Sequence, residues 1–251
     1  MTNNNRLEAS KAYEEGKYKQ AAEIYHNILE NDPKDAMAHQ GLAQSLYKIN
    51  DFNQAEVECK KAVELQPSLP IAHLTLAKIY AKKGNLDQSE LEVKHTIELD
   101  QNFVEAYVTL AAIKFEQKKY QAAVDMFSKA IELNPQNWFA YYSLGISLQN
   151  LGQYDKACSA LEIAFKIQPS FDVGIILLYA YFLKYRIWIG LVLGFIVIAS
   201  LLTDYLSPII LIASFYLVGS VLNFRSGRKS QSIGILLVSI LLFCLYLFLR
   251  K

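Results

Sequence analysis

Residues of the same size and kind return every 34 positions over the first two thirds of the chain. One slot of this pattern always holds a small residue: Ala9, Ala43, Ala77, Ala111 and Gly145. A fixed period of this length is typical of stacked two-helix units, each of which buries its apolar side only against its neighbours. The period therefore predicts a row of helical hairpins along most of the chain.

The second helix of each predicted hairpin has recurring positions of its own. A large apolar or aromatic residue opens it, at Tyr18, Phe52, Leu86, Tyr120 and Tyr154. A second small residue follows where a bulkier side chain would separate the helices, at Ala21, Ala55, Ser89, Ala123 and Ala157. Residues that favour a positive φ lie in the turns between the helices, at Gly16, Asn50, Gly84 and Gly152. Prolines separate most of the hairpins, at Pro33, Pro67, Pro135 and Pro169.

In these positions the chain resembles the tetratricopeptide repeat (TPR) family over about residues 2–171. The unit from Trp138 to Pro169 carries the pattern most fully, whereas Gln101 stands where proline is usual and Lys118 where a turn glycine is usual. The resemblance implies an all-α fold, a right-handed α-solenoid of about five helical hairpins in residues 1–171. It also implies a binding scaffold.

The segment after the last repeat, residues 172–186, is expected to form a capping helix in the place of a sixth first helix. Asp172 is a suitable N-cap for it, because its carboxylate can accept hydrogen bonds from the first free backbone N–H groups. The segment is more apolar than a cap that faces water should be. We therefore expect it to lead directly into a membrane.

Composition changes sharply near residue 184. Residues 1–183 carry 18 Lys and Arg against 23 Asp and Glu, whereas residues 184–251 carry seven basic residues and one acid, Asp204. Three apolar runs in this last part, at about 187–204, 207–223 and 233–249, predict three transmembrane helices in a membrane domain of residues 187–251. The runs are short for spans, but they have no polar face with which a soluble helix would meet water.

The basic residues around these runs predict their orientation, because cytoplasmic loops carry the excess of Lys and Arg. Five of them lie before the first span or between the second and third: Lys184, Arg186, Arg225, Arg228 and Lys229. The sequence thus predicts a multi-pass integral membrane protein whose repeats are cytoplasmic and which has the lipid bilayer as one partner.

No pattern in the sequence indicates catalysis. There is no Gly-rich phosphate loop, no GxSxG or HExxH motif and no paired Cys/His arrangement. His39 and His73 share one slot of the repeat, which Tyr107 and Tyr141 fill in the next two, so a common packing role explains them without zinc. We expect no enzyme activity, metal, cofactor or small-molecule substrate, and the acidic repeat region argues against nucleic acid as a partner.

In TPR proteins the first helices line a concave groove that binds a peptide or a helix of a partner. In this chain the corresponding positions are polar and partly basic in the second and third repeats, and apolar or aromatic towards the membrane. They are Gln40, Gln44, Lys48, Thr75, Lys78, Lys82, Thr109, Ala112, Glu116, Tyr142, Ile146 and Gln149. The set of Lys, Arg and Asn with which one TPR subtype grips a C-terminal carboxylate matches none of the three-repeat frames.

Two hypotheses of function remain open. In the first, the protein is a membrane-anchored scaffold or adaptor whose groove binds a peptide or helix of a partner protein. In the second, it is a structural or assembly-factor subunit of a larger membrane complex, whose main contacts are made by the transmembrane helices. Gly190 and Gly194 form a GxxxG pair that would serve the second hypothesis as a packing face, but glycine is also common in membrane helices generally.

Overall fold

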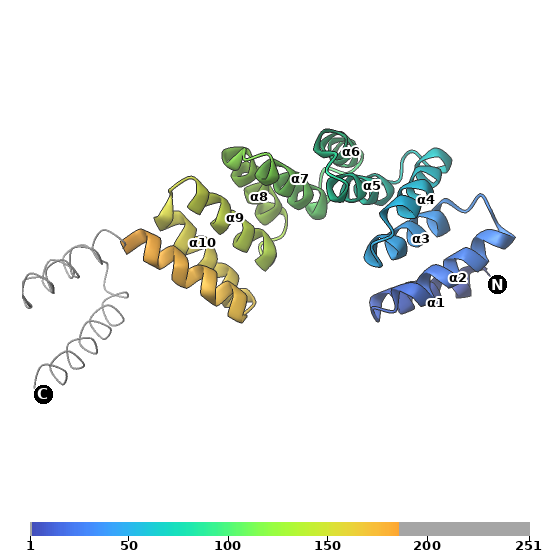
Figure 1. Cartoon of the computed structure of the whole chain (residues 1–251), viewed down its shortest axis with the longest axis horizontal. Helices are drawn as coiled ribbons and strands as arrows, with labels where there is room; N and C mark the ends of the chain where they lie inside the picture. Colours follow the sequence, from blue (N-terminus) through green and yellow to red (C-terminus); the bar gives the residue numbers. More distant parts are fainter. Residues whose placement is uncertain (1, 186–251) are drawn as a thin grey trace, which may run out of the picture. The chain divides into compact units, whose positions relative to one another are not determined.

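A computed structural model of the chain describes residues 2–185, with side chains from residue 5 onward. The chain divides into two units, residues 1–184 and 185–251, and the ten labelled helices belong to the first (Figure 1). Among the described residues, no helix is both long enough and apolar enough to cross a membrane. The three predicted spans, with Gly190 and Gly194, lie outside the described residues.

All regular structure within residues 2–185 is helical. In chain order the helices are α1 (Thr2–Glu14), α2 (Tyr18–Asn31), α3 (Ala36–Lys48), α4 (Phe52–Leu65), α5 (Pro70–Lys82), α6 (Leu86–Leu99), α7 (Val104–Glu116), α8 (Tyr120–Leu133), α9 (Trp138–Asn150) and α10 (Tyr154–Ile167). A further helix, which we call the terminal helix, covers residues 171–185. These elements confirm the predicted all-α row of five hairpins followed by one more helix.

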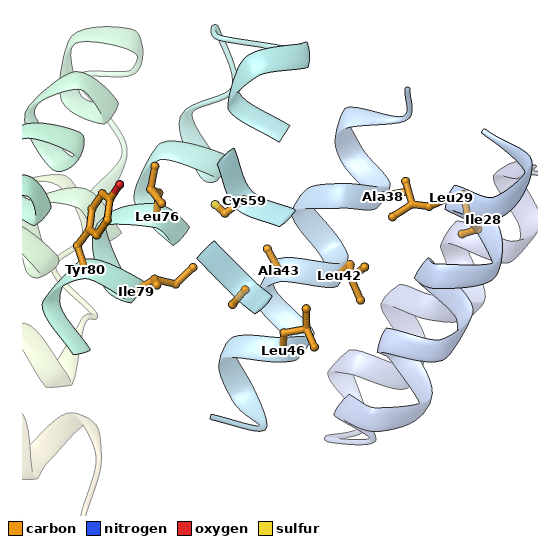
Figure 2. Packing of buried hydrophobic residues seen from close by; sticks show 11 residues of the cluster. Ile28, Leu29, Ala38, Leu42, Ala43, Leu46, Cys59, Leu76, Ile79 and Tyr80 are labelled. Carbon is orange, nitrogen blue, oxygen red and sulfur yellow. The ribbon is translucent and has the colours of Figure 1, made fainter. Parts of the chain in front are cut away.

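The two helices of each hairpin meet at the small residues that recur in the sequence. Nine of these ten side chains are fully buried, at 0% exposure: Ala9, Ala43, Ala77 and Ala111 in the first helices, and Ala21, Ala55, Ser89, Ala123 and Ala157 in the second. Each second helix also packs against the first helix of the next hairpin. Apolar side chains fill the space between hairpins, and Figure 2 shows this for Leu29 of α2, Leu42 of α3 and Leu76 of α5.

The turn inside each hairpin holds one residue in the left-handed region of the backbone. These residues are Gly16, Asn50, Gly84, Lys118 and Gly152, with φ between 59° and 81°. Lys118 adopts this conformation although it lacks the preference of Gly or Asn for it. Its N–H donates to the Phe115 carbonyl at 2.8 Å, and the Lys119 N–H donates to the Lys114 carbonyl at 2.9 Å. These two hydrogen bonds are those of a helix C-terminal cap, and they hold the turn without glycine.

The N-cap of the terminal helix differs from the prediction. The helix begins at residue 171, so Asp172 lies within its first turn. Ser170 is the cap instead, because its hydroxyl accepts a hydrogen bond from the Val173 N–H at 3.4 Å. The Ser170 carbonyl also accepts the first helical hydrogen bond, from the Gly174 N–H at 3.0 Å. The sequence analysis named only Asp172, a residue type that caps helices, and the start of a helix is uncertain by one or two residues.

The terminal helix packs against the last hairpin. Val173 and Ala180 are 1% and 0% exposed. Ala180 belongs to an apolar cluster with Cys158 and Leu161 of α10, and Tyr142 of α9 packs against the same cluster. The terminal helix therefore covers the last repeat, in the place that the sequence assigned to a sixth first helix.

Ion pairs between neighbouring hairpins add polar contacts to this packing. The carboxylate of Glu90 on α6 lies 2.6 Å from Lys114 Nζ on α7 and 2.8 Å from Lys94 Nζ on its own helix. Hydrogen bonds from Lys114 and Lys94 lower the pKa of Glu90 to about 2, because both favour its charged form. The Glu90 and Lys114 side chains are only 15% and 16% exposed, so solvent screens this pair less than it screens a surface pair.

We expect the Glu90→Gln variant to be less stable than the wild-type protein by about 1–2 kcal/mol near neutral pH. The pKa of Glu90 is lower in the folded state than its ordinary value of 4.5. Its contribution is therefore present above that value and is lost as the pH falls through about 2. Urea unfolding curves of both proteins, recorded from neutral pH down to about pH 2, measure the difference. The exposed Glu132→Gln change is the control, and a Glu90→Gln difference that persists undiminished in acid contradicts the prediction.

Candidate protein-binding face

One side of each first helix carries the residues that the sequence assigned to the groove. On α7 these residues, with Glu105, are exposed or half-buried, and their spacing of four, three and four residues places them in one line along the helix: Glu105, Thr109, Ala112 and Glu116. Corresponding lines run through Gln40, Gln44 and Lys48 on α3, through Thr75, Lys78 and Lys82 on α5, and through Phe139, Tyr142, Ile146 and Gln149 on α9. We call these four lines together the first-helix face.

Contacts join the first three lines of the first-helix face and tie the α9 line to the terminal helix. Helix α3 contacts α5, and α5 contacts α7. Lys78 Nζ on α5 lies 2.6 Å from Glu105 Oε1 on α7, which links two lines directly. At the far end, Gln149 Nε2 on α9 donates to the Ile176 carbonyl of the terminal helix at 3.5 Å. The face is thus a surface shared by several hairpins rather than a set of separate helix sides.

The accessibility of the predicted groove residues varies along this face. Gln40 and Thr75 are 6% and 4% exposed, and the Thr75 hydroxyl donates to the Ile71 carbonyl of its own helix at 2.8 Å. A partner cannot reach these two side chains without moving the helices beside them. By contrast, Lys48, Lys82 and Ala112 are more accessible. The repeat period predicts which side of each helix these residues share, but the close approach of consecutive first helices covers part of that side.

The face is less basic than the sequence suggested. Lys78 forms an ion pair with Glu105, so its charge is largely neutralised. Lys48 Nζ lies 5.8 Å from the centre of the Tyr18 ring, in a cation–π contact with α2. Of the three lysines predicted to line the groove, two are therefore already engaged within the protein, and the face does not present a strongly positive surface.

An aromatic cluster lies at the α9 end of the face. The ring centre of Phe139 is 5.8 Å from that of Trp138 and 6.4 Å from that of Tyr142, and the Trp138 and Tyr142 rings are 6.3 Å apart. Phe139 is 45% exposed. Sequence reasoning named Tyr142 for the groove but not Trp138 or Phe139. The signal was present in the run WFAYY at the start of the helix, where residues 138, 139 and 142 fall within about one turn of one another.

His39 and His73 each link their own hairpin to the turn that precedes it. The Nδ1 atom of His39 lies 2.6 Å from Glu58 Oε2 on α4, and its Nε2 atom lies 3.1 Å from the Pro33 carbonyl oxygen. The same two contacts recur one repeat later at His73, at 2.7 Å and 2.9 Å. Both ring nitrogens face acceptor oxygens, so the imidazole donates to both only in its doubly protonated form.

In the next repeat Tyr107 makes one of these two contacts. The Tyr107 hydroxyl donates to the Gln101 carbonyl at 3.1 Å, and Gln101 occupies the position of Pro33 and Pro67. The shared role of the slot is thus a hydrogen bond to the carbonyl six residues earlier, which ties the inter-repeat turn to the first helix. A packing role was predicted for this slot, and the hydrogen bond gives its physical basis.

The described residues show neither a metal-binding cluster nor an activated cysteine at Cys59. Residues 2–185 hold no group of three His, Cys, Asp or Glu side chains arranged for a metal ion. Burial raises the pKa of the Cys59 thiol to about 12, and its Sγ donates to the Ala72 carbonyl at 3.1 Å. Such a thiol is protonated and covered, which is the opposite of an activated nucleophile.

Comparison with known proteins places the chain in a family. Residues 7–192 match the model of the family described as intraflagellar transport protein 56, which is well over half of the chain. The chain belongs to this family. The match begins within α1 of this family member and extends through the five hairpins and the terminal helix. No curated protein matches it.

Solved structures share the fold of this intraflagellar transport protein 56 family member. The thermophilic TPR protein TTC0263 of Thermus thermophilus is 18% identical with a TM-score of 0.63, over 72% of this chain and 99% of that one. MamA is 21% identical with a TM-score of 0.56, over 64% and 94% of the two chains. YrrB, described as a TPR protein with an unusual peptide-binding site, is 20% identical with a TM-score of 0.53, over 66% and 86%. At these identities the likeness establishes a TPR-type helical repeat fold.

Proposed function

We propose that the protein is a membrane-anchored scaffold that binds an extended peptide or a helix of a partner protein on its first-helix face, without catalysis. The observation that carries the proposal is the row of exposed and half-buried side chains shared by α3, α5, α7 and α9. A surface built from several stacked helices offers a partner one contact per repeat, which suits an elongated ligand. The peptide-binding site named for YrrB, a protein of similar fold, is consistent with this use.

The chemistry of the face indicates what the ligand must supply. Phe139 is partly exposed beside Trp138 and Tyr142, so an apolar side chain of the ligand can pack there. Aromatic clusters of this kind commonly dominate the binding energy of a protein interface. Ala112 on α7 leaves room for the ligand backbone to approach, and Lys82 and Glu116 offer opposite charges at the ends of their helices. The best ligand is therefore a segment with one large apolar residue and few net charges.

The membrane anchor in this proposal rests on the sequence of residues 187–251. Three apolar runs with one acidic residue between them have the composition of membrane spans. The excess of Lys and Arg before the first run and between the second and third favours a cytoplasmic location for the repeats. A scaffold held in this way keeps its ligand at the membrane surface.

Site-specific photocrosslinking in the full-length protein tests the binding face. A benzophenone amino acid at Ala112 on α7 or at Phe139 on α9 is expected to crosslink to one and the same partner segment, identified by mass spectrometry. Val57 provides the matched control, because it is apolar and 49% exposed but lies on a second helix, α4. Crosslinking to that segment from Val57, or from neither face position, contradicts the proposal.

The affinity of the captured segment gives a second measure. Phe139→Ala is expected to weaken its binding about five-fold or more, since an aromatic anchor typically contributes more than about 1 kcal/mol. Replacing residues 187–251 with an unrelated membrane anchor should leave the crosslinks unchanged. If that replacement abolishes them, the alternative holds, in which the protein is an assembly subunit that makes its main contacts through its own spans.

A further inference from the structure

The terminal helix exposes a continuous line of large apolar side chains. Five residues between 46% and 82% exposed occur at steps of four, three, one and three: Phe171, Ile175, Leu178, Tyr179 and Phe182. This spacing places all five on one side of the helix. No other described helix exposes as many large apolar side chains, and single exposed residues of this kind need no explanation whereas a contiguous set does.

The opposite side of the same helix is fully used for packing. Val173 and Ala180 are buried, and Ile176, Leu177 and Tyr181 pack around the cluster of α10 residues. The Tyr181 hydroxyl also donates to the Glu162 carboxylate of α10. The orientation of the helix on the last hairpin is therefore fixed from that side. The contacts of the packed side fix the rotation of the helix, so the apolar line faces outward.

The apolar line continues onto α10. A Cβ atom at Gly174 would lie 3.6 Å from a ring carbon of Phe165, which places the Phe165 ring beside the outer side of the terminal helix. Phe165 is itself 39% exposed. We call Phe165 and the five residues of the terminal helix together the terminal apolar surface. It belongs to the last hairpin and its covering helix.

We infer that the terminal apolar surface lies in the interface of a lipid bilayer, so that the terminal helix rests along the membrane with α10 on its other side. The inference rests on the proposed membrane anchor. The chain itself supplies the argument for lipid, because the terminal helix is described up to residue 185 and an apolar run begins two residues later in the sequence, at Ile187. A membrane span that starts there would keep the C-terminal end of the terminal helix close to lipid.

The composition of the terminal apolar surface also suits lipid better than protein. Its members are aliphatic or aromatic, without one charged side chain among them, and Tyr179 combines an apolar ring with a polar tip. Interfacial helices bind by apolar area and by aromatic rings at the depth of the headgroups. Lys166, which follows Phe165 in the sequence, is exposed and can meet anionic headgroups.

The depth of Leu178 in a membrane tests this inference. Full-length protein with Cys59, Cys158 and Cys244 replaced by alanine would receive a nitroxide at Leu178→Cys, and would be reconstituted into vesicles of phosphatidylcholine and phosphatidylglycerol. The ratio of collisions with oxygen to collisions with a water-soluble nickel chelate is expected to be at least about five times higher at Leu178 than at Gln88→Cys, an exposed position on α6. Circular dichroism confirms that each labelled protein is folded.

The outcomes separate this inference from the proposed function. Flotation of the protein with vesicles after a carbonate wash tests the anchor alone. If the protein floats but the Leu178 label collides with the nickel chelate as often as the Gln88 label does, the surface is in water and the inference fails while the anchor stands. If the Leu178 label is protected from both reagents, protein covers the surface and lipid does not, which also overturns the inference. If the protein does not float, both fail.

Discussion

Replacing His39 with alanine is expected to lower the free energy of unfolding by about 2–3 kcal/mol, because it leaves buried hydrogen-bonding groups without their partner. The His39 and Glu58 side chains are 7% and 6% exposed and lie 2.6 Å apart. Removal of the imidazole leaves the Glu58 carboxylate without its closest donor and the Pro33 carbonyl without the contact at 3.1 Å. The loss is moderated because Lys61 Nζ remains 3.0 Å from the other Glu58 oxygen.

Two variants serve as controls for this prediction. His26→Ala removes a histidine whose side chain is 68% exposed and 3.8 Å from Glu30, so we expect a change below about 0.5 kcal/mol. His39→Tyr copies Tyr107, the residue in the same slot, whose hydroxyl bonds the preceding carbonyl; it restores that bond but not the contact with Glu58. Its free energy of unfolding should lie between those of the other two variants. Urea unfolding of full-length protein in mild detergent, followed by circular dichroism, measures all three, and an equal effect of His39→Ala and His26→Ala would refute the role given to His39.

Gly145→Leu is expected to destabilise the protein by about 1–3 kcal/mol through overpacking. A Cβ atom at this position would lie 2.5 Å from Leu161 Cγ and 3.3 Å from the Ala157 carbonyl oxygen. The Leu161 side chain is fully buried, so it has little room to move away. The other repeats tolerate alanine in the slot of Gly145, which shows how closely the two helices of the last hairpin approach each other.

Urea unfolding, as for the His39 variants, measures this change and includes a matched glycine and a rescue variant. Gly174→Ala introduces a methyl group that meets only Phe165 at 3.6 Å, an ordinary contact. Since alanine favours a helix over glycine by up to about 1 kcal/mol, this variant should be as stable as the wild-type protein or more so. Combining Gly145→Leu with Leu161→Ala should recover part of the loss. If Gly145→Leu leaves the stability unchanged, the pairing of α9 with α10 at this position is incorrect.

The sequence predicted the helices of the repeat region well because their signals are local and repeated. Each small residue, turn residue and opening aromatic recurs, so one weak position such as Lys118 is interpreted through the other four. The N-cap of the terminal helix occurs once, so no second example corrected the choice of Asp172, and the cap is Ser170. Repetition, more than the strength of any single motif, made the fold predictable.

The candidate site was less predictable because it depends on distances between helices. The repeat period assigns a side of the helix to each position, but it does not say how near the next first helix lies. Gln40 and Thr75 are on the expected side and yet covered. Lys78 was expected to face a ligand, but the side chain of Glu105 neutralises it from α7, 27 residues later in the chain. Such contacts between repeats follow from three-dimensional packing and have no signature within one repeat.

The pattern of contacts between hairpins has a consequence for how this chain can change over evolutionary time. Each second helix packs on its own hairpin and on the first helix of the next one, and the inter-repeat turn is tied to the helix that follows it. A duplicated or deleted block of one repeat length therefore carries a complete set of partners with it, and the junction it creates has the same chemistry as the junctions already present. The number of units, and with it the length of ligand that the scaffold can accommodate, can vary without redesign of either end.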